Sequence, residues 1–187
     1  MRTRSKRYTQ EREQISGEPV GLKEGIEKLK GFKSVKFNQS VECILHLGID
    51  PRQADQIVRG SVSLPHGIGT QKRVVAFCEG AEVQACRQAG AVEAGSDELI
   101  EKINNGWLDF DVAVASSNVM RKVGKLGRIL GPQGKMPTPK NGTVTEEVVT
   151  AVKEFTAGKV EYRNDSGGIL HSVVGKQSFE TQKLIEN

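Results

Sequence analysis

The stretch Arg73-Val-Val-Ala-Phe-Cys78 decides the fold class of this chain, because a continuous apolar strand is typical of a sheet that is covered on both faces. Asp111-Val-Ala-Val-Ala115 has the same character. The neighbouring segments alternate with these strands, and their spacing predicts helices over 83–89, 97–104 and 145–155 and a short strand over 91–93. Strand and helix in alternation predict a mostly parallel sheet with helices on both sides, a Rossmann-like three-layer α/β domain.

The two ends of the chain have another pattern. Leu22, Ile26 and Leu29 predict a helix that ends near Gly31. The alternation of apolar and polar residues over 41–47 predicts a half-buried strand. Further strands are predicted over 59–64, 159–163 and 169–176, the last two joined as a hairpin by the turn at 164–168.

This change of pattern predicts two domains. We expect an α+β domain made from both chain ends, residues 1–67 and 159–187, with the α/β domain inserted over 68–158. Glycines flank the two crossings between the domains and predict a hinge there: Gly67, Gly69 and Gly158.

Composition restricts the class of protein. The chain has 187 residues and a net charge of +4. No apolar run approaches the roughly 20 residues that a membrane-spanning helix needs. Three cysteines and three histidines occur at no metal-ligand spacing. These features predict a soluble, cytoplasmic protein with no metal site, no membrane partner and reduced, mostly buried thiols.

Nucleotide-binding and catalytic fingerprints fail residue by residue. Gly67-Ile-Gly69 would need glycine at the position of Lys72 to complete a dinucleotide motif. Gly134-Lys135 would need Ser or Thr at the position of Met136 to complete a phosphate-binding loop. No H-E-x-x-H or G-x-S-x-G sequence occurs. We therefore predict no catalytic residues, no cofactor and a protein that is not an enzyme.

The segment over 112–145 contains no acidic residue. It carries six positive charges, on Arg121, Lys122, Lys125, Arg128, Lys135 and Lys140. A surface of this kind favours a polyanionic partner.

Helical spacing recurs within this basic segment at Val119, Val123, Leu126 and Leu130. We expect Ser116 or Ser117 to cap the helix. We expect Gly131 to end it in a left-handed turn before Pro132.

Lys36-Phe37 combines a cation that can bind phosphate with a ring that can stack on a base. The alternative for Phe37 is a core aromatic. The polar sequence Lys36-Phe-Asn-Gln-Ser40 argues against burial and favours an RNA contact.

Five motifs follow one another along the chain: Leu47-Gly-Ile-Asp-Pro-Arg-Gln-Ala-Asp-Gln-Ile-Val-Arg-Gly60, Leu64-Pro-His-Gly67, Gly106-Trp-Leu-Asp-Phe-Asp111, Val123-Gly-Lys-Leu-Gly-Arg-Ile-Leu-Gly-Pro-Gln-Gly-Lys-Met-Pro-Thr-Pro139 and Tyr162-Arg-Asn-Asp165. In this order they resemble the bacterial type of the L-one family, the universal large-subunit ribosomal proteins of the mobile stalk beside the exit site. The likeness covers essentially the whole chain and implies the same two-domain layout.

The resemblance implies an RNA site on the first domain. Lys36, Phe37 and Ser40 match a family pattern of Lys-Phe followed three residues later by a hydroxyl residue. A second implied segment supplies groups that read ribose and base edges or neutralise phosphate, with a glycine that admits the RNA backbone: Arg163, Asn164, Asp165, Gly168, His171 and Lys176.

The resemblance also implies partners. They are large-subunit ribosomal RNA, deacylated tRNA at the exit site and the leader of the protein's own messenger RNA, whose translation it would repress, with the free protein a monomer. A further face for tRNA or a second RNA is implied at Lys125, Arg128, Lys135 and Lys140.

The sequence departs from the family after 178–187, where the family usually completes a helix and adds a strand and a Thr-Met-Gly loop. We expect either a truncated chain or a weaker grip on RNA. Two alternatives remain open, a stand-alone α/β protein with an unrecognised ligand and a truncated paralogue that has lost RNA binding.

Overall fold

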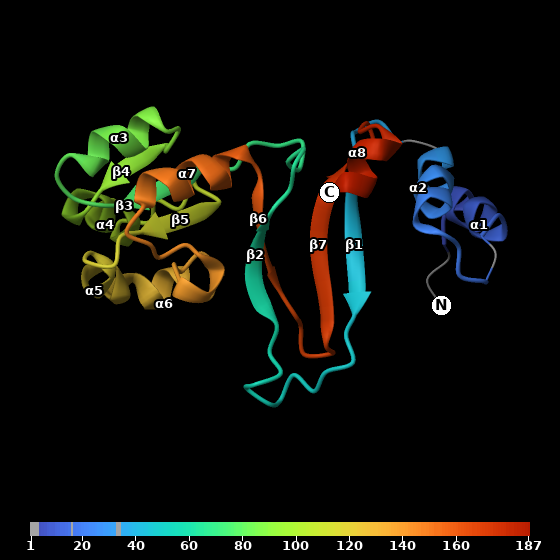
Figure 1. Ribbon diagram of the computed structural model, residues 1–187, viewed down its shortest axis with the longest axis horizontal. Coiled ribbons are helices and arrows are strands. Elements are labelled where there is room, and N and C mark those ends of the chain that lie inside the picture. The colour runs from blue at the N-terminus through green and yellow to red at the C-terminus, as the bar shows by residue number, and fades with distance from the viewer. Residues whose placement is uncertain (1–3, 16, 33–34) are drawn as a thin grey trace.

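Figure 1 shows the computed structural model, which describes residues 4–15, 17–32 and 35–187. Helices, short 3-10 turns and strands in these residues are, in chain order, α1 (Lys6–Glu13), α2 (Leu22–Gly31), β1 (Ser40–His46), β2 (Arg59–Ser63), β3 (Val74–Phe77), α3 (Glu82–Gln88), β4 (Glu93–Gly95), α4 (Asp97–Asn104), β5 (Val112–Ala115), α5 (Met120–Val123), η1 (Gly124–Leu126), α6 (Gly127–Leu130), η2 (Pro139–Asn141), α7 (Val148–Ala157), β6 (Lys159–Arg163), β7 (Ile169–Lys176) and α8 (Thr181–Glu186).

The α/β part has three layers. Its parallel sheet has the order β4-β3-β5, and the alternate side chains of β3 point into two separate cores. Val75 and Phe77 pack with α4 and the α5–α6 segment, whereas Val74 and Ala76 pack with α3 and α7. All four residues of β3 are fully buried. The predicted α/β class is confirmed, since helices cover both faces of a parallel sheet.

The remaining strands form two antiparallel pairs, β1 with β7 and β2 with β6. In Figure 1 the β2–β6 pair stands between the α/β layers and the β1–β7 pair. α8 lies at one end of the β1–β7 pair, and α2 and α1 lie beyond that pair. The predicted hairpin between β6 and β7 is wrong. Each strand pairs with a strand from the N-terminal third, and among the described residues the ladder contact between β6 and β7 is the isolated bridge Asn164–Leu170.

Burial along β1 also differs from the prediction. Val41 is buried, whereas Cys43 and Leu45 are exposed. The reason is that α2 and α8 pack at the Val41 end of the strand (Figure 1) and leave its other end uncovered. Buried thiols were predicted correctly for Cys78 and Cys86 but not for Cys43.

The helical residues of the basic segment are buried as predicted, at Val119, Val123, Leu126 and Leu130. The predicted serine caps are wrong, because α5 begins only after Val119 and no side chain caps it. The left-handed turn at Gly131 is wrong too, since its φ is −58°. A Cβ on Gly131 would lie 2.5 Å from the Gly127 carbonyl oxygen, so close backbone approach requires glycine there. The left-handed turn is made by Gly134, with φ 70°.

Two other boundaries move by a few residues for identifiable reasons. β4 begins at Glu93, because Ala91 still donates its amide to Cys86 at the end of α3. α7 begins at Val148 rather than near Thr145, because Val144 is still extended and bridges Ala115 of β5.

Candidate nucleic-acid interface

One face of the β1–β7 pair carries three of the predicted RNA residues, Ser40, His171 and Lys176. Directly opposed residues of an antiparallel pair point to the same face. On this face the opposed pairs are Ser40–Lys176, Glu42–Val173, Ile44–His171 and His46–Ile169.

A first group of predicted residues meets where β1 starts and β7 ends. We call Lys36, Phe37, Ser40 and Lys176 the Phe37 patch. The Lys176 ammonium donates to Ser40 Oγ at 2.9 Å. Phe37 is 68% exposed, which excludes the core alternative for this ring. Lys36 is exposed beside it, so a cation and an aromatic face are both open to solvent.

Asn38 anchors the segment that presents Phe37. Its side-chain amide donates to Ser178 Oγ at 2.8 Å, and its Oδ1 accepts from the Ser178 amide at 3.2 Å. Gln177 donates its amide to the Gln39 carbonyl at 2.9 Å and continues the ladder beyond β7. The ring therefore projects from a segment whose backbone is anchored directly after it, at Asn38 and Gln39.

A second group lies at the turn between β6 and β7. We call Arg163, Asp165 and His171 the turn patch, and all three are exposed. Asp165 Oδ1 accepts from the amides of Gly167 and Ile169, each at 2.8 Å. These backbone hydrogen bonds, led by Ile169, hold the Asp165 pKa below its ordinary value, and the charges of His171 and His46 act in the same direction.

Two residues predicted for this second group serve the protein itself. Asn164 is buried, and its Oδ1 accepts from the Val58 amide at 2.8 Å while its Nδ2 donates to the Asp165 carbonyl at 2.9 Å. A Cβ on Gly168 would lie 3.2 Å from the Ile49 carbonyl oxygen. Glycine is needed at 168 because the chain packs against Ile49.

The two patches are separate. His171 and Lys176 are five residues apart on β7, which corresponds to about 17 Å along a strand. Seven of the nine predicted residues therefore form two separate patches and not one cluster, and Arg163 of the turn patch lies on β6 and not on the β1–β7 pair. Glu42 and His46 lie on the same face between or beside the patches and were missed. The alternation that begins at Ser40 was the signal that could have found them.

The basic helical segment presents some of its charges and uses others internally. Lys125, Arg128 and Lys140 are exposed. Lys135 instead donates to the Leu108 carbonyl at 3.1 Å, and its ammonium lies 5.0 Å from the centroid of the Phe110 ring. Lys122 pairs with Glu79 and Asp97, each at 2.9 Å.

A polar junction between the β2–β6 pair and the loop at η2 was not predicted from the sequence. Asn141 is buried, accepts from Arg59 Nε at 2.7 Å and donates to Glu161 Oε2 at 2.6 Å. Arg59 also donates to Thr138 Oγ1 at 3.1 Å. Burial raises the pKa of Glu161 and lowers that of the neighbouring Lys72. These contacts join the α/β layers to the strands made from the chain ends.

The three predicted hinge glycines all have positive φ, 61° at Gly67, 75° at Gly69 and 123° at Gly158. Gly67 and Gly158 are in contact, so the two crossings run side by side. A Cβ on Gly69 would lie 2.9 Å from Lys176 Cγ. The first crossing therefore lies against the Phe37 patch.

Within the described part of the chain, no cluster of three or more His, Cys, Asp or Glu side chains could hold a metal ion. No helix in residues 4–15, 17–32 or 35–187 is long and apolar enough to cross a membrane.

Comparison with known proteins gives a consistent result. The model of the Ribosomal protein L1p/L10e family matches residues 29–187. Large ribosomal subunit protein uL1 of Kosmotoga olearia is 50% identical, with 100% of this chain and 81% of the relative covered. The protein of the same name from Protochlamydia amoebophila is 52% identical, with 89% and 70% covered. That of Thermobifida fusca is 49% identical, with 98% and 79% covered.

Proposed function

Because the chain belongs to the Ribosomal protein L1p/L10e family, we propose that it is a structural RNA-binding protein of the large ribosomal subunit. The protein would then act on the ribosome, in the cytoplasm. The relatives carry the name of a large-subunit protein and cover most of the chain, which supports this role.

The Phe37 patch is the observation that carries the proposal. A ring that is 68% exposed has no packing role and is free to stack on a base or pack against a sugar. Lys36 and Lys176 flank it and would neutralise phosphates. Ser40 Oγ, which holds the Lys176 ammonium, orients that cation toward the same face.

The turn patch would add contacts further along the same RNA. Arg163 would bind phosphate, and the ionised Asp165 carboxylate would accept from ribose hydroxyls or base amino groups. His171 lies on the same face as Lys176 and would donate or accept at a base edge. Two separated patches fit a folded RNA segment that runs along the β1–β7 pair to the turn between β6 and β7.

We further propose that the α/β layers, residues 68–158, form a domain inserted between residues 1–67 and 159–187. The paired crossings at Gly67 and Gly158 would let this domain move with the ribosomal stalk as deacylated tRNA leaves. Exposed Lys125, Arg128 and Lys140 would then face tRNA or a second RNA. A structure in the messenger RNA leader that is similar to the ribosomal RNA site would compete for the first domain, and binding of the protein there would repress translation.

A salt titration of RNA binding tests the function. With about three to four phosphates contacted, the affinity for a stalk fragment of large-subunit ribosomal RNA should fall with a log–log slope of about −3 to −4. Lys36→Ala should reduce that slope by about one. Lys153→Ala is the matched control, since Lys153 is exposed on α7 in the α/β layers and belongs to neither patch.

A slope near zero, or equal effects of Lys36→Ala and Lys153→Ala, would reject the proposed interface. Co-sedimentation with large subunits at moderate salt supplies an independent readout. A protein that stays entirely in the supernatant would favour a stand-alone α/β protein or a paralogue without RNA binding.

A further inference from the structure

β7 contains one residue more than β1 between two successive pairs. Val41 lies opposite Gly175, but the next residue, Glu42, lies opposite Val173. Val174 is left without a partner, which makes it a β-bulge.

The bulge changes which way Lys176 points. His171 and Lys176 are an odd number of residues apart, and in a regular strand such residues point to opposite faces. The extra residue shifts the alternation by one, so Lys176 comes opposite Ser40 and His171 opposite Ile44. Ser40 and Ile44 are on one face of β1, and the hydrogen bond between Lys176 and Ser40 agrees with this placement.

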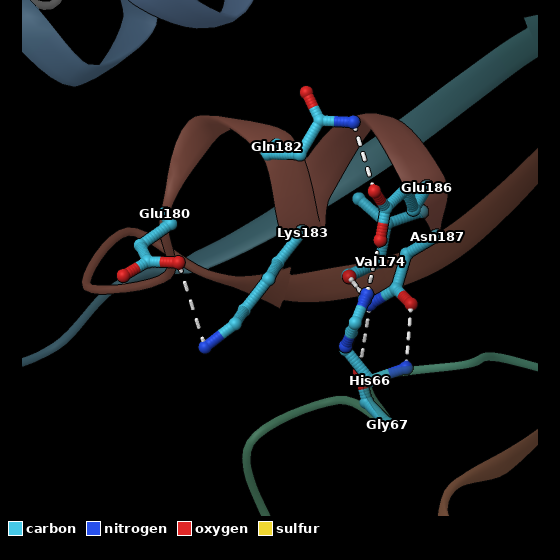
Figure 2. A network of polar contacts seen from close by, with 8 residues as sticks. All are labelled: His66, Gly67, Val174, Glu180, Gln182, Lys183, Glu186 and Asn187. Carbon is cyan, nitrogen blue, oxygen red and sulfur yellow. Dashed lines mark hydrogen bonds and ion pairs between the residues drawn. The ribbon is translucent and has the colours of Figure 1, made fainter.

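Asn187 holds the bulge. Its Nδ2 donates to the Val174 carbonyl at 2.8 Å, as Figure 2 shows, and so satisfies a carbonyl that lies at the break in the ladder. Leu184 of the same helix is buried over the bulge, since a Cβ on Gly175 would lie 2.9 Å from Leu184 Cδ2. α8 is therefore the element that fixes the irregular part of β7.

The same amide also holds the first crossing. Asn187 Nδ2 donates to the Gly67 carbonyl at 2.9 Å, and its Oδ1 accepts from the His66 amide at 3.0 Å. Figure 2 shows His66 meeting Glu186, the last residue of α8. The Asn187 side chain donates two hydrogen bonds and accepts one. This combination requires an amide, because a carboxylate offers no N–H and a hydroxyl offers a single O–H.

We infer that Asn187 is a positioning residue for RNA binding, which fixes the β7 bulge so that Lys176 faces the same RNA as His171 and ties this placement to the first crossing. Asn187 acts through Lys176 and makes no RNA contact of its own. The inference rests on the proposed function.

A double-mutant cycle tests the inference with the stalk RNA fragment as the probe. Lys176→Ala should weaken binding about tenfold and reduce the salt slope by about one. Asn187→Asp keeps the size and the acceptor but removes both donors, and it should weaken binding about three- to tenfold with the same loss of slope. Combined with Lys176→Ala, it should add less than about twofold, because its effect passes through Lys176.

A readout without RNA separates this inference from the proposed function. In the free wild-type protein, nuclear Overhauser contacts should connect the side chains of Lys176 and Ser40, and Asn187→Asp should abolish them. Asn187→Ala removes the donors without adding charge and should do the same. Gln182→Ala is the matched control on α8, since the Gln182 amide donates to Glu186, and it should leave contacts and affinity unchanged.

Retained Lys176–Ser40 contacts in both Asn187 variants overturn the inference while leaving the proposed function intact. The inference is also overturned if the loss of affinity in the double mutant equals the product of the losses in Asn187→Asp and Lys176→Ala, because the two residues then act independently. Absence of salt-dependent binding by the wild type rejects the proposed function and with it the role of Asn187 in RNA binding.

Discussion

Gly67 and Gly158 lie back to back where the chain passes twice between the strands made from its ends and the α/β layers. A Cβ on Gly158 would lie 2.6 Å from the Gly67 Cα, and a Cβ on Gly67 would lie 2.9 Å from the Ala157 carbonyl oxygen. Both residues also have positive φ. Backbone conformation and lack of space therefore both demand glycine at this contact.

Gly158→Ala should lower the free energy of unfolding by about 2–4 kcal/mol, since the strain of positive φ adds to a clash with backbone atoms. Urea unfolding measures this change. Gly106→Ala is the control, because Gly106 also has positive φ, 95°, but open space around it, and it should cost only about 1–2 kcal/mol. Equal costs would show that the contact with Gly67 is not tight.

Asn141→Ala should destabilise the protein by about 1–3 kcal/mol, because the Arg59 guanidinium and the half-buried Glu161 carboxylate both lose a partner. Denaturant unfolding followed by fluorescence of Trp107 measures this loss. Asn38→Ala removes an exposed amide pair with Ser178 and should change stability by less than about 0.5 kcal/mol. Similar values for the two variants would mean that the junction at Asn141 contributes no more than a surface contact.

Phe37→Ala should weaken RNA binding by about 1–3 kcal/mol, the range for one lost stacking platform. The melting temperature should hardly change, because the ring is 68% exposed and leaves no cavity. Phe110→Ala is the opposite case, since that ring is fully buried and its loss should cost about 3–5 kcal/mol of stability. A large drop in melting temperature for Phe37→Ala would reassign this ring to packing.

Asp165→Asn should remove a pH dependence of stability. The folded-state pKa of Asp165 lies below its ordinary value of 3.8, so its ionised form stabilises the fold above that pH. This stabilisation is lost as the pH falls below about 3.8 and through the lower folded-state pKa. The wild type should therefore approach the variant in stability only in that acid range, in unfolding experiments between pH 2.5 and 7.

The part of this difference that comes from the backbone hydrogen bonds should stay constant from about pH 5 to 7, because Asp165 is ionised there in both the folded and the unfolded state. A difference that changes across neutral pH would point to another group.

The local sequence was sufficient to predict the strands and helices whose apolar residues follow a regular pattern. The continuous apolar runs at β3 and β5 predicted a sheet covered on both faces, and the structure confirms it. The helix predicted over 97–104 is confirmed by α4, which buries Leu99, Ile100 and Ile103. The family resemblance carried by the ordered motifs is confirmed by the family model over residues 29–187.

Exposure of the RNA residues was predicted in part. The polar neighbourhood of Phe37 correctly indicated an exposed ring. Asn164 and Gly168 were also predicted to contact RNA. In the structure, however, Asn164 accepts a hydrogen bond from the Val58 amide, and Gly168 packs against Ile49. These partners are distant in sequence from the turn, so no local pattern could reveal them.

The sequence by itself determined the periodicity of strands and helices, since that signal depends on which neighbouring side chains share a face. Only the tertiary structure decided that β6 pairs with β2 and β7 with β1, because the edge of a strand bonds with whichever strand the whole fold brings beside it. It also decided the direction of Lys176, through a bulge held by Asn187. A bulge cannot be recognised from the sequence of its own strand, because a residue is unpaired only in relation to the opposing strand. The register between β1 and β7 depends on two segments that are more than 120 residues apart in the sequence.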